Sequence, residues 1–223
     1  MVYVYKKGVK EFFWSVSDFL ASQTKRDTNI IAGQDGLYEI RDAAFGRMVT
    51  KTEFVRELEP IQPGFRFSLP KIPGEFLETI VSFFRSLVTE EIQLEALVYI
   101  YWDHERKQYF LECPEQLVSK ASVEAVYNPA LQNSNRFVHV AEIHSHNTMG
   151  AYFSKVDDAN EQAFRIYGVV GKLDSVPAEM KLRVGYNGKY IPLPLDYIFE
   201  YVNLNSNQKP IPITWFEKIK VVG

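Results

Sequence analysis

His144 and His146 offer the clearest potential for chemistry, because they are two of only 4 histidines in a chain of 223 residues. In a β-strand, side chains two residues apart point to the same face, so both imidazoles could reach one point in space. Neutral imidazole is a preferred zinc ligand, and a catalytic zinc ion usually has three protein ligands and one open position. The spacing therefore predicts a zinc site with a third ligand close by. The alternative is two partly exposed histidines at a strand end that bind no ion.

Asp157 is the expected third ligand, because it follows the two histidines closely at the start of a predicted helix. Ser154 lies three residues before it, and Ser at an N-cap with an acid at N3 resembles a capping box. Capping alone would explain this pair of residues. The two interpretations are compatible, since a cap would orient the first turn while the carboxylate binds the metal.

The remaining histidines and the single cysteine are expected to lie outside the metal site. His139 has the opposite strand parity to His144, so we expect it to pack or hydrogen-bond elsewhere. His104 lies in a charged turn and is expected to be solvated. Cys113 lies in an apolar run and cannot form an internal disulfide, which favours a buried structural thiol.

The run from His144 to Asp157 resembles the motif of the JAMM (MPN+) zinc metallopeptidases: His-Ser-His, seven residues, Ser154, two residues, Asp. The resemblance covers about residues 74–190 and is greatest to bacterial or mobile-element members. It implies a curved mixed β-sheet flanked by helices, similar to that of cytidine deaminases. It also implies that His144, His146 and Asp157 bind Zn2+, and that Ser154 stabilises the oxyanion of a tetrahedral intermediate.

The same family uses a glutamate as general acid and base, placed at the start of a strand after the first helix. The best match is Glu95, which precedes a run of β-branched and aromatic residues. Glu90 and Glu91 are rivals in the preceding polar loop, and Glu142 is a rival on the strand face of the two histidines. The family often has Pro after the second His, whereas this chain has Asn147, so we expect a different loop shape rather than lost catalysis.

The elements that must position these residues follow from hydrophobic periodicity. Phe76, Ile80, Phe83, Phe84 and Leu87 predict an amphipathic helix after Pro73. A hairpin is expected from strands at 95–102 and 108–113, and a helix from Ser154 through about Tyr167. Further strands are expected at 136–146, 167–173, 180–186 and 190–193, while 195–202 stays ambiguous. Mixed elements without regular βαβ alternation favour the α+β class.

Residues 1–72 are expected to form a small β-rich N-terminal region, and 73–223 the domain that carries the site. The first part contains short alternating stretches at 36–40 and 46–51, and ends in a proline-rich linker or extended wrap. This region could dock substrate, mediate dimerisation or occlude the site. Its sequence does not rank these roles, and the oligomeric state is equally open.

Charge and composition exclude several other classes of protein. The net charge is −3, and no basic stripe is visible, so nucleic acid is not an expected partner. No apolar run is long enough to span a membrane, and residues 1–7 show no signal peptide, so we expect a cytoplasmic protein.

The expected function is zinc-dependent hydrolysis of a peptide or isopeptide bond in a protein or peptide substrate, such as a ubiquitin-like or sulfur-carrier protein. The first alternative is a non-catalytic MPN-like scaffold that holds zinc and recruits protein partners. The second is a zinc hydrolase that acts on another bond, such as a small-molecule amide.

Overall fold

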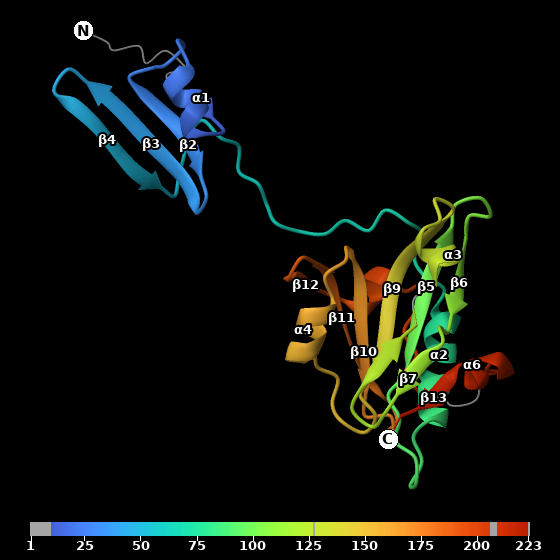
Figure 1. Ribbon diagram of the computed structural model, residues 1–223. Helices are drawn as coiled ribbons and strands as arrows, with labels where there is room; N and C mark the ends of the chain where they lie inside the picture. Colours follow the sequence, from blue (N-terminus) through green and yellow to red (C-terminus); the bar gives the residue numbers. More distant parts are fainter. Residues whose placement is uncertain (1–9, 127, 206–208, 223) are drawn as a thin grey trace. The chain divides into compact units, whose positions relative to one another are not determined.

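A computed structural model describes residues 10–126, 128–205 and 209–222 (Figure 1). The first residues, on which the expectation about a signal peptide rests, lie outside this part of the chain. The chain divides into two compact units, residues 1–63 and 64–223. No helix in the described part is long and apolar enough to cross a membrane.

The N-terminal unit is a four-stranded sheet in the order β1-β2-β3-β4, with one short helix. Its elements are β1 (Lys10–Phe13), α1 (Val16–Ala21), β2 (Thr28–Gly33), β3 (Gly36–Ala43) and β4 (Gly46–Thr52). The hairpin β3–β4 contains both stretches that alternation predicted. Its small core comprises Phe13, Phe19, Ile31 and Ile40.

The C-terminal unit is built on a six-stranded sheet in the order β12-β11-β10-β9-β5-β6. The strands are β5 (Leu97–Asp103), β6 (Gln108–Glu112), β9 (Phe137–Ser145), β10 (Arg165–Gly171), β11 (Glu179–Tyr186) and β12 (Lys189–Leu193). Strands β9 and β10 pair parallel, and every other neighbouring pair in this sheet is antiparallel. The mixed sheet with few helices confirms the α+β class.

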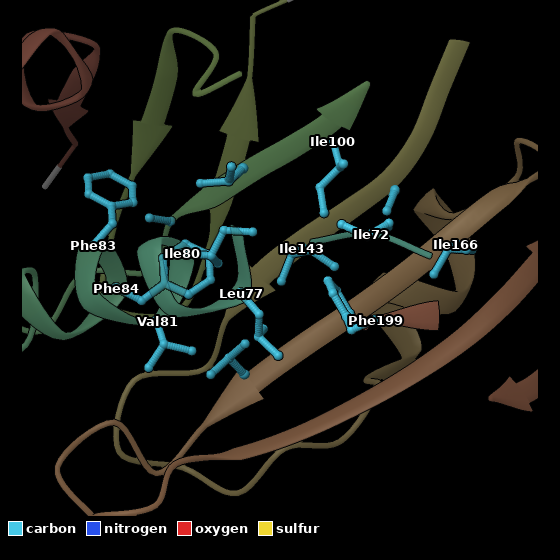
Figure 2. Close-up of a cluster of buried hydrophobic side chains, with 14 of the residues drawn as sticks. Ile72, Leu77, Ile80, Val81, Phe83, Phe84, Ile100, Ile143, Ile166 and Phe199 are labelled. Carbon is cyan, nitrogen blue, oxygen red and sulfur yellow. The ribbon is translucent and has the colours of Figure 1, made fainter. Parts of the chain in front are cut away.

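One face of this sheet is covered by helix α2 (Gly74–Ser86), the helix that the apolar stripe predicted. Ile80, Phe83 and Phe84 of that stripe are fully buried, because they pack against the inward residues of β5 and β9 (Figure 2). Ile143 of β9 belongs to this core. Since side chains alternate along a strand, His144 next to it faces away from α2.

Residues 64–72 pack on the C-terminal unit as an extended segment. Ile72 is fully buried, its N–H donates to Ile198 O, and its carbonyl accepts from Glu200 N. Phe65, Phe67 and Leu69 also contact the core. The structure divides the chain after residue 63, earlier than the expected boundary after residue 72. The reason is that residues 64–72 of the proline-rich stretch pack on the C-terminal unit.

The remaining elements are short. They are β7 (Gln116–Val118), β8 (Val123–Ala125), α3 (Pro129–Gln132), α4 (Lys155–Asn160), α5 (Leu195–Ile198), α6 (Ile213–Glu217) and β13 (Ile219–Val221). Strands β13, β7 and β8 form a separate three-stranded sheet. Cys113 is buried in the connection between β6 of the large sheet and β7 of the small sheet. Burial raises the pKa of its thiol to about 12, as expected for a structural thiol.

The helix expected from Ser154 to about Tyr167 is wrong in extent. Helix α4 ends at Asn160, and strand β10 begins at Arg165. The apolar spacing of Val156 and Ala159 is not a buried face, because both side chains are exposed. Helix α4 thus occupies a short part of the crossover that the parallel β9–β10 pairing requires.

We expect the ion pair between Asp103 and Arg136 to stabilise the pairing of the end of β5 with the start of β9 in a pH-dependent way. Two hydrogen bonds from Arg136 lower the pKa of the Asp103 carboxyl from 3.8 to about 2. A lowered folded-state pKa contributes stability that is present above pH 4 and lost as pH falls toward 2. Urea unfolding should therefore show Asp103→Asn to be less stable than wild type at pH 7, with a smaller difference at pH 3. An equal difference at both pH values would contradict this assignment.

Candidate metal centre

The two histidines lie at the carboxyl end of β9. His144 is opposite Leu97 of β5, and His146 N donates to Val170 O of β10. Between the histidines, the buried Ser145 donates its N–H to Ala96 O and accepts from Ala96 N through Oγ. These two hydrogen bonds between Ser145 and Ala96 fix the end of β9 that carries both imidazoles.

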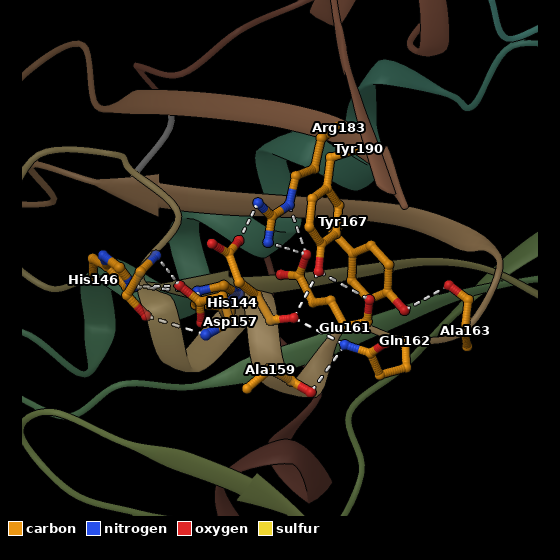
Figure 3. A network of polar contacts seen from close by, with 12 residues as sticks. His144, His146, Asp157, Ala159, Glu161, Gln162, Ala163, Tyr167, Arg183 and Tyr190 are labelled. Carbon is orange, nitrogen blue, oxygen red and sulfur yellow. Dashed lines mark hydrogen bonds and ion pairs between the residues drawn. The ribbon is translucent and has the colours of Figure 1, made fainter. Parts of the chain in front are cut away.

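Both imidazoles and the Asp157 carboxylate converge on one region (Figure 3). His144 Nε2 lies 3.2 Å from His146 Nε2 and 3.4 Å from Asp157 Oδ1, and His146 Nε2 lies 3.9 Å from Asp157 Oδ2. Ligand atoms about 2.0–2.1 Å from a tetrahedral zinc ion are separated by roughly 3.3 Å. The two distances from His144 are close to this value, the distance from His146 to Asp157 is longer, and one ligand atom from each residue lies within 4.8 Å of the other two. The three side chains could therefore hold one metal ion.

The protonation state of the histidines also suits metal binding. Burial lowers the pKa of His144 to about 4 and lowers the pKa of His146, although the Asp157 carboxylate opposes both shifts. The imidazoles are therefore neutral at pH 7, as metal coordination requires. The second ring nitrogen of His146, Nδ1, is buried and has no hydrogen-bond partner in the described part of the chain.

Asp157 reaches the histidines from the first turn of α4. Ser154 is the N-cap: its Oγ accepts from Asp157 N at 3.2 Å, and its N–H donates to Asp157 Oδ2 at 2.5 Å. The predicted capping box is therefore present together with the convergence on the histidines. Because Ser154 Oγ only accepts in this cap, the bond to Asp157 leaves the hydroxyl hydrogen free to be donated elsewhere.

Glu95 lies just before β5 and is 5% exposed. Its N–H donates to Ser119 O, and the next residue, Ala96, is the one held by Ser145 between the histidines. Burial raises the pKa of the Glu95 carboxyl to about 7, and the nearby Asp157 carboxylate adds to the increase. Glu95 is thus a desolvated carboxylic acid near Asp157 of the candidate metal centre.

The rival glutamates are placed differently. Glu90 and Glu91 are exposed in the loop before β5. Glu142 lies on the same sheet face as His144, but Arg165 Nη1 donates to its Oε2 at 3.2 Å. Burial raises the pKa of Glu142 while Arg165 lowers it.

His139 does not have the strand parity that counting predicts. A bulge in the β5–β9 ladder pairs Tyr101 with His139 although Tyr99 pairs with Glu142, so His139 shares the sheet face of His144. The ring of His139 packs between Tyr99 and Tyr101, with centroids 4.3 and 4.6 Å apart. His139 therefore packs apart from His144, His146 and Asp157, as expected. The cause is its contact with the two tyrosines, not the opposite strand parity. His104 is exposed, as predicted.

The loop from Asn147 to Phe153 joins the two halves of the site. Leu173 N donates to Asn147 O, Lys172 N donates to Met149 O, and Met149 N donates to His146 O. Asn147 has a positive φ of 46°, which Asn tolerates better than most residues. The turn after β10 thus holds the loop in place.

Sequence reasoning missed the polar network that holds α4. Arg183 of β11 bonds Asp158 and Glu161, and Tyr190 OH of β12 donates to Asp158 O at 2.7 Å. These residues lie outside the motif, and Arg183 alternates with apolar neighbours in a way typical of a solvated strand face. Only the contacts of Arg183 with Asp158 and Glu161 in the folded chain distinguish it from a solvated strand residue.

Comparison with known proteins finds no family model and no curated protein that matches this chain.

We expect Gly171→Ala to displace the loop between the histidines and α4. An added Cβ would lie 2.5 Å from Ala151 N and from Gly150 C, backbone atoms that can yield only by moving the loop. Overpacking of this kind costs about 1–3 kcal/mol, so the free energy of unfolding should fall by that amount. The affinity of the His144, His146 and Asp157 group for a divalent metal ion, measured by competition with a chelating dye, should fall as well.

Gly64→Ala is the matched control, because a Cβ there meets no atom of the described residues within 4 Å. Wild-type stability and metal affinity in Gly171→Ala would show that the loop does not depend on this close approach.

Proposed function

We propose that this protein is a zinc-dependent hydrolase of peptide or isopeptide bonds, of the JAMM (MPN+) kind. The observation that carries the proposal is the convergence of His144, His146 and Asp157, whose ligand atoms lie within 4.8 Å of one another, with the buried Glu95 nearby. Two imidazoles and one carboxylate leave the fourth position of zinc open. Zinc held there would supply a Lewis acid that acidifies water and polarises a carbonyl.

Glu95 is the general acid and base in this proposal. A group whose pKa lies near the operating pH can both accept and return a proton. The Glu95 carboxylate would take the proton of the attacking water and deliver it to the leaving amine. Its burial, which raises the pKa to about 7, supports both halves of that task better than the exposed Glu90 or Glu91 would allow.

Ser154 would stabilise the developing oxyanion. Its Oγ accepts from Asp157 N, which fixes the hydroxyl beside the metal group while its hydrogen remains to be donated. A donor fixed before the reaction needs no reorganisation as charge develops on the substrate oxygen.

The departure from the family motif at Asn147 has a local explanation. Proline is restricted to φ near −65°, so it could not adopt the φ of 46° found at this position. Asn147 Nδ2 instead donates to Lys120 O at 2.8 Å and ties the loop to the β7–β8 turn. The loop therefore differs in shape while the ligand atoms still converge, which is consistent with retained chemistry.

The fold class is compatible with the proposal. A mixed sheet has α2 on one face and the candidate site on the other, at the carboxyl end of β9. The substrate class that we propose is a protein or peptide, such as a ubiquitin-like or sulfur-carrier protein.

The test is hydrolysis of peptide and ubiquitin-like fusion substrates by zinc-loaded protein, followed by mass spectrometry. Glu95→Gln should retain zinc and reduce kcat by about 10²- to 10⁴-fold, because proton transfer is lost. Ser154→Ala should reduce kcat by about 10²- to 10³-fold. Glu91→Gln is the exposed control and should retain wild-type turnover.

Full turnover in Glu95→Gln would overturn the assignment of the base. Zinc binding without cleavage of any peptide or isopeptide substrate, together with full biological activity of His144→Ala/His146→Ala, would favour the scaffold function instead.

A further inference from the structure

Helix α4 carries a proposed metal ligand but lacks the apolar packing that usually holds a helix in place. All six of its residues are described, and none of them is buried; Val156 is 66% exposed. Isolated helices shorter than about 12 residues are marginal in water. Polar contacts must therefore position Asp157.

Arg183 of β11 supplies most of these contacts. Its side chain is 9% exposed, its Nη1 donates to Asp158 Oδ1 at 2.7 Å, and its Nε donates to Glu161 Oε2 at 2.7 Å (Figure 3). Asp158 follows the ligand Asp157 directly, and Glu161 is the C-cap of the helix. One guanidinium thus holds both the first turn and the end of α4.

Two aromatic rings fix the guanidinium from both sides. The Arg183 Cζ lies 3.8 Å from the ring centroid of Phe153 and 3.8 Å from that of Tyr190. Phe153 immediately precedes the N-cap Ser154, and Tyr190 OH donates to Asp158 O. The stack therefore connects the start of the helix to β11 and β12.

The carboxyl groups around Asp157 also favour a positive charge at Arg183. Asp157 and Asp158 lie on this short helix, Glu161 caps its end, and Glu142 lies near Asp157 on the sheet below. Arg183 bonds Asp158 and Glu161, so its positive charge offsets negative charge beside Asp157. Its bidentate, planar group can reach both Asp158 and Glu161, whereas a lysine ammonium is a single point charge on a flexible stem.

We propose that Arg183 is a positioning residue that holds Asp157 in place for the metal ion. It acts through α4 and does not itself touch the proposed ligand atoms. This inference rests on the metal site of the proposed function, but not on the hydrolytic reaction.

The experiment is titration of the full-length apo-protein with Co2+ alone, followed by visible absorption, with thermal unfolding of the same samples. Arg183→Met should weaken Co2+ binding by about 10- to 100-fold, the range typical of residues that support metal ligands. Its ligand-field spectrum should change, because the carboxylate is no longer held. Arg183→Lys keeps the positive charge, so it should fold with a smaller loss of thermal stability than Arg183→Met, and it should bind Co2+ about 10-fold more weakly than wild type.

Arg136→Met is the matched control, since Arg136 also makes paired hydrogen bonds to a buried aspartate, at the far end of β9. It should lower thermal stability without changing Co2+ affinity or the spectrum. If Arg183→Met does not fold, Arg183→Lys decides the question.

Wild-type affinity and spectrum in the folded Arg183 variants would overturn the inference. So would an equal loss of affinity in Arg136→Met, which would indicate a general effect of stability. Failure of the wild type to bind Co2+ would overturn both this inference and the metal site, whereas binding without hydrolysis would count against the proposed reaction alone.

Discussion

The parallel pairing of β9 with β10 is the constraint on which the site depends. Parallel neighbours need a crossover connection, and here the crossover leaves from the end of β9 and returns over the face opposite α2. His144 and His146 lie at the start of that connection and Asp157 in its helix. Groups from two parts of the chain can meet at one point because the crossover must fold back across the strand from which it left.

Burial then determines the chemistry of the groups that meet. The sheet face beside α4 is shielded enough to keep both imidazoles neutral and to raise the pKa of Glu95 to about 7. The same shielding makes unpaired charges costly, which explains why the carboxylates around Asp157 are accompanied by Arg165 and Arg183. A single desolvated face thus accounts for the neutral imidazoles and for the arginines that pair with the nearby carboxylates.

Local patterns in the sequence predicted the elements with strong periodicity. The stripe from Ile80 to Phe84 predicted α2, and alternation around the turn after Asp103 predicted the β5–β6 hairpin. The convergence of His144, His146 and Asp157 was also predictable, because two residues in a strand and a capped helix start fix their directions over short distances.

What the sequence could not predict depends on contacts between distant segments. The bulge beside His139 reverses a parity that counting alone must assume. Helix α4 ends earlier than its helical spacing suggests, and Val156 and Ala159, which have that spacing, are exposed and add no buried packing. Arg183 is 26 positions beyond Asp157 in the sequence, and only the order of strands β10, β11 and β12 brings it beneath the helix.

X-ray absorption spectroscopy of the zinc-loaded protein would show directly whether the two histidines bind the ion. We expect one zinc ion per chain, four-coordinate, with two imidazole nitrogens and oxygen ligands at about 2.0–2.1 Å. That spectrum should be lost in His144→Ala/His146→Ala. A chain that binds no stoichiometric zinc, or whose zinc spectrum lacks imidazole scattering, would contradict this expectation.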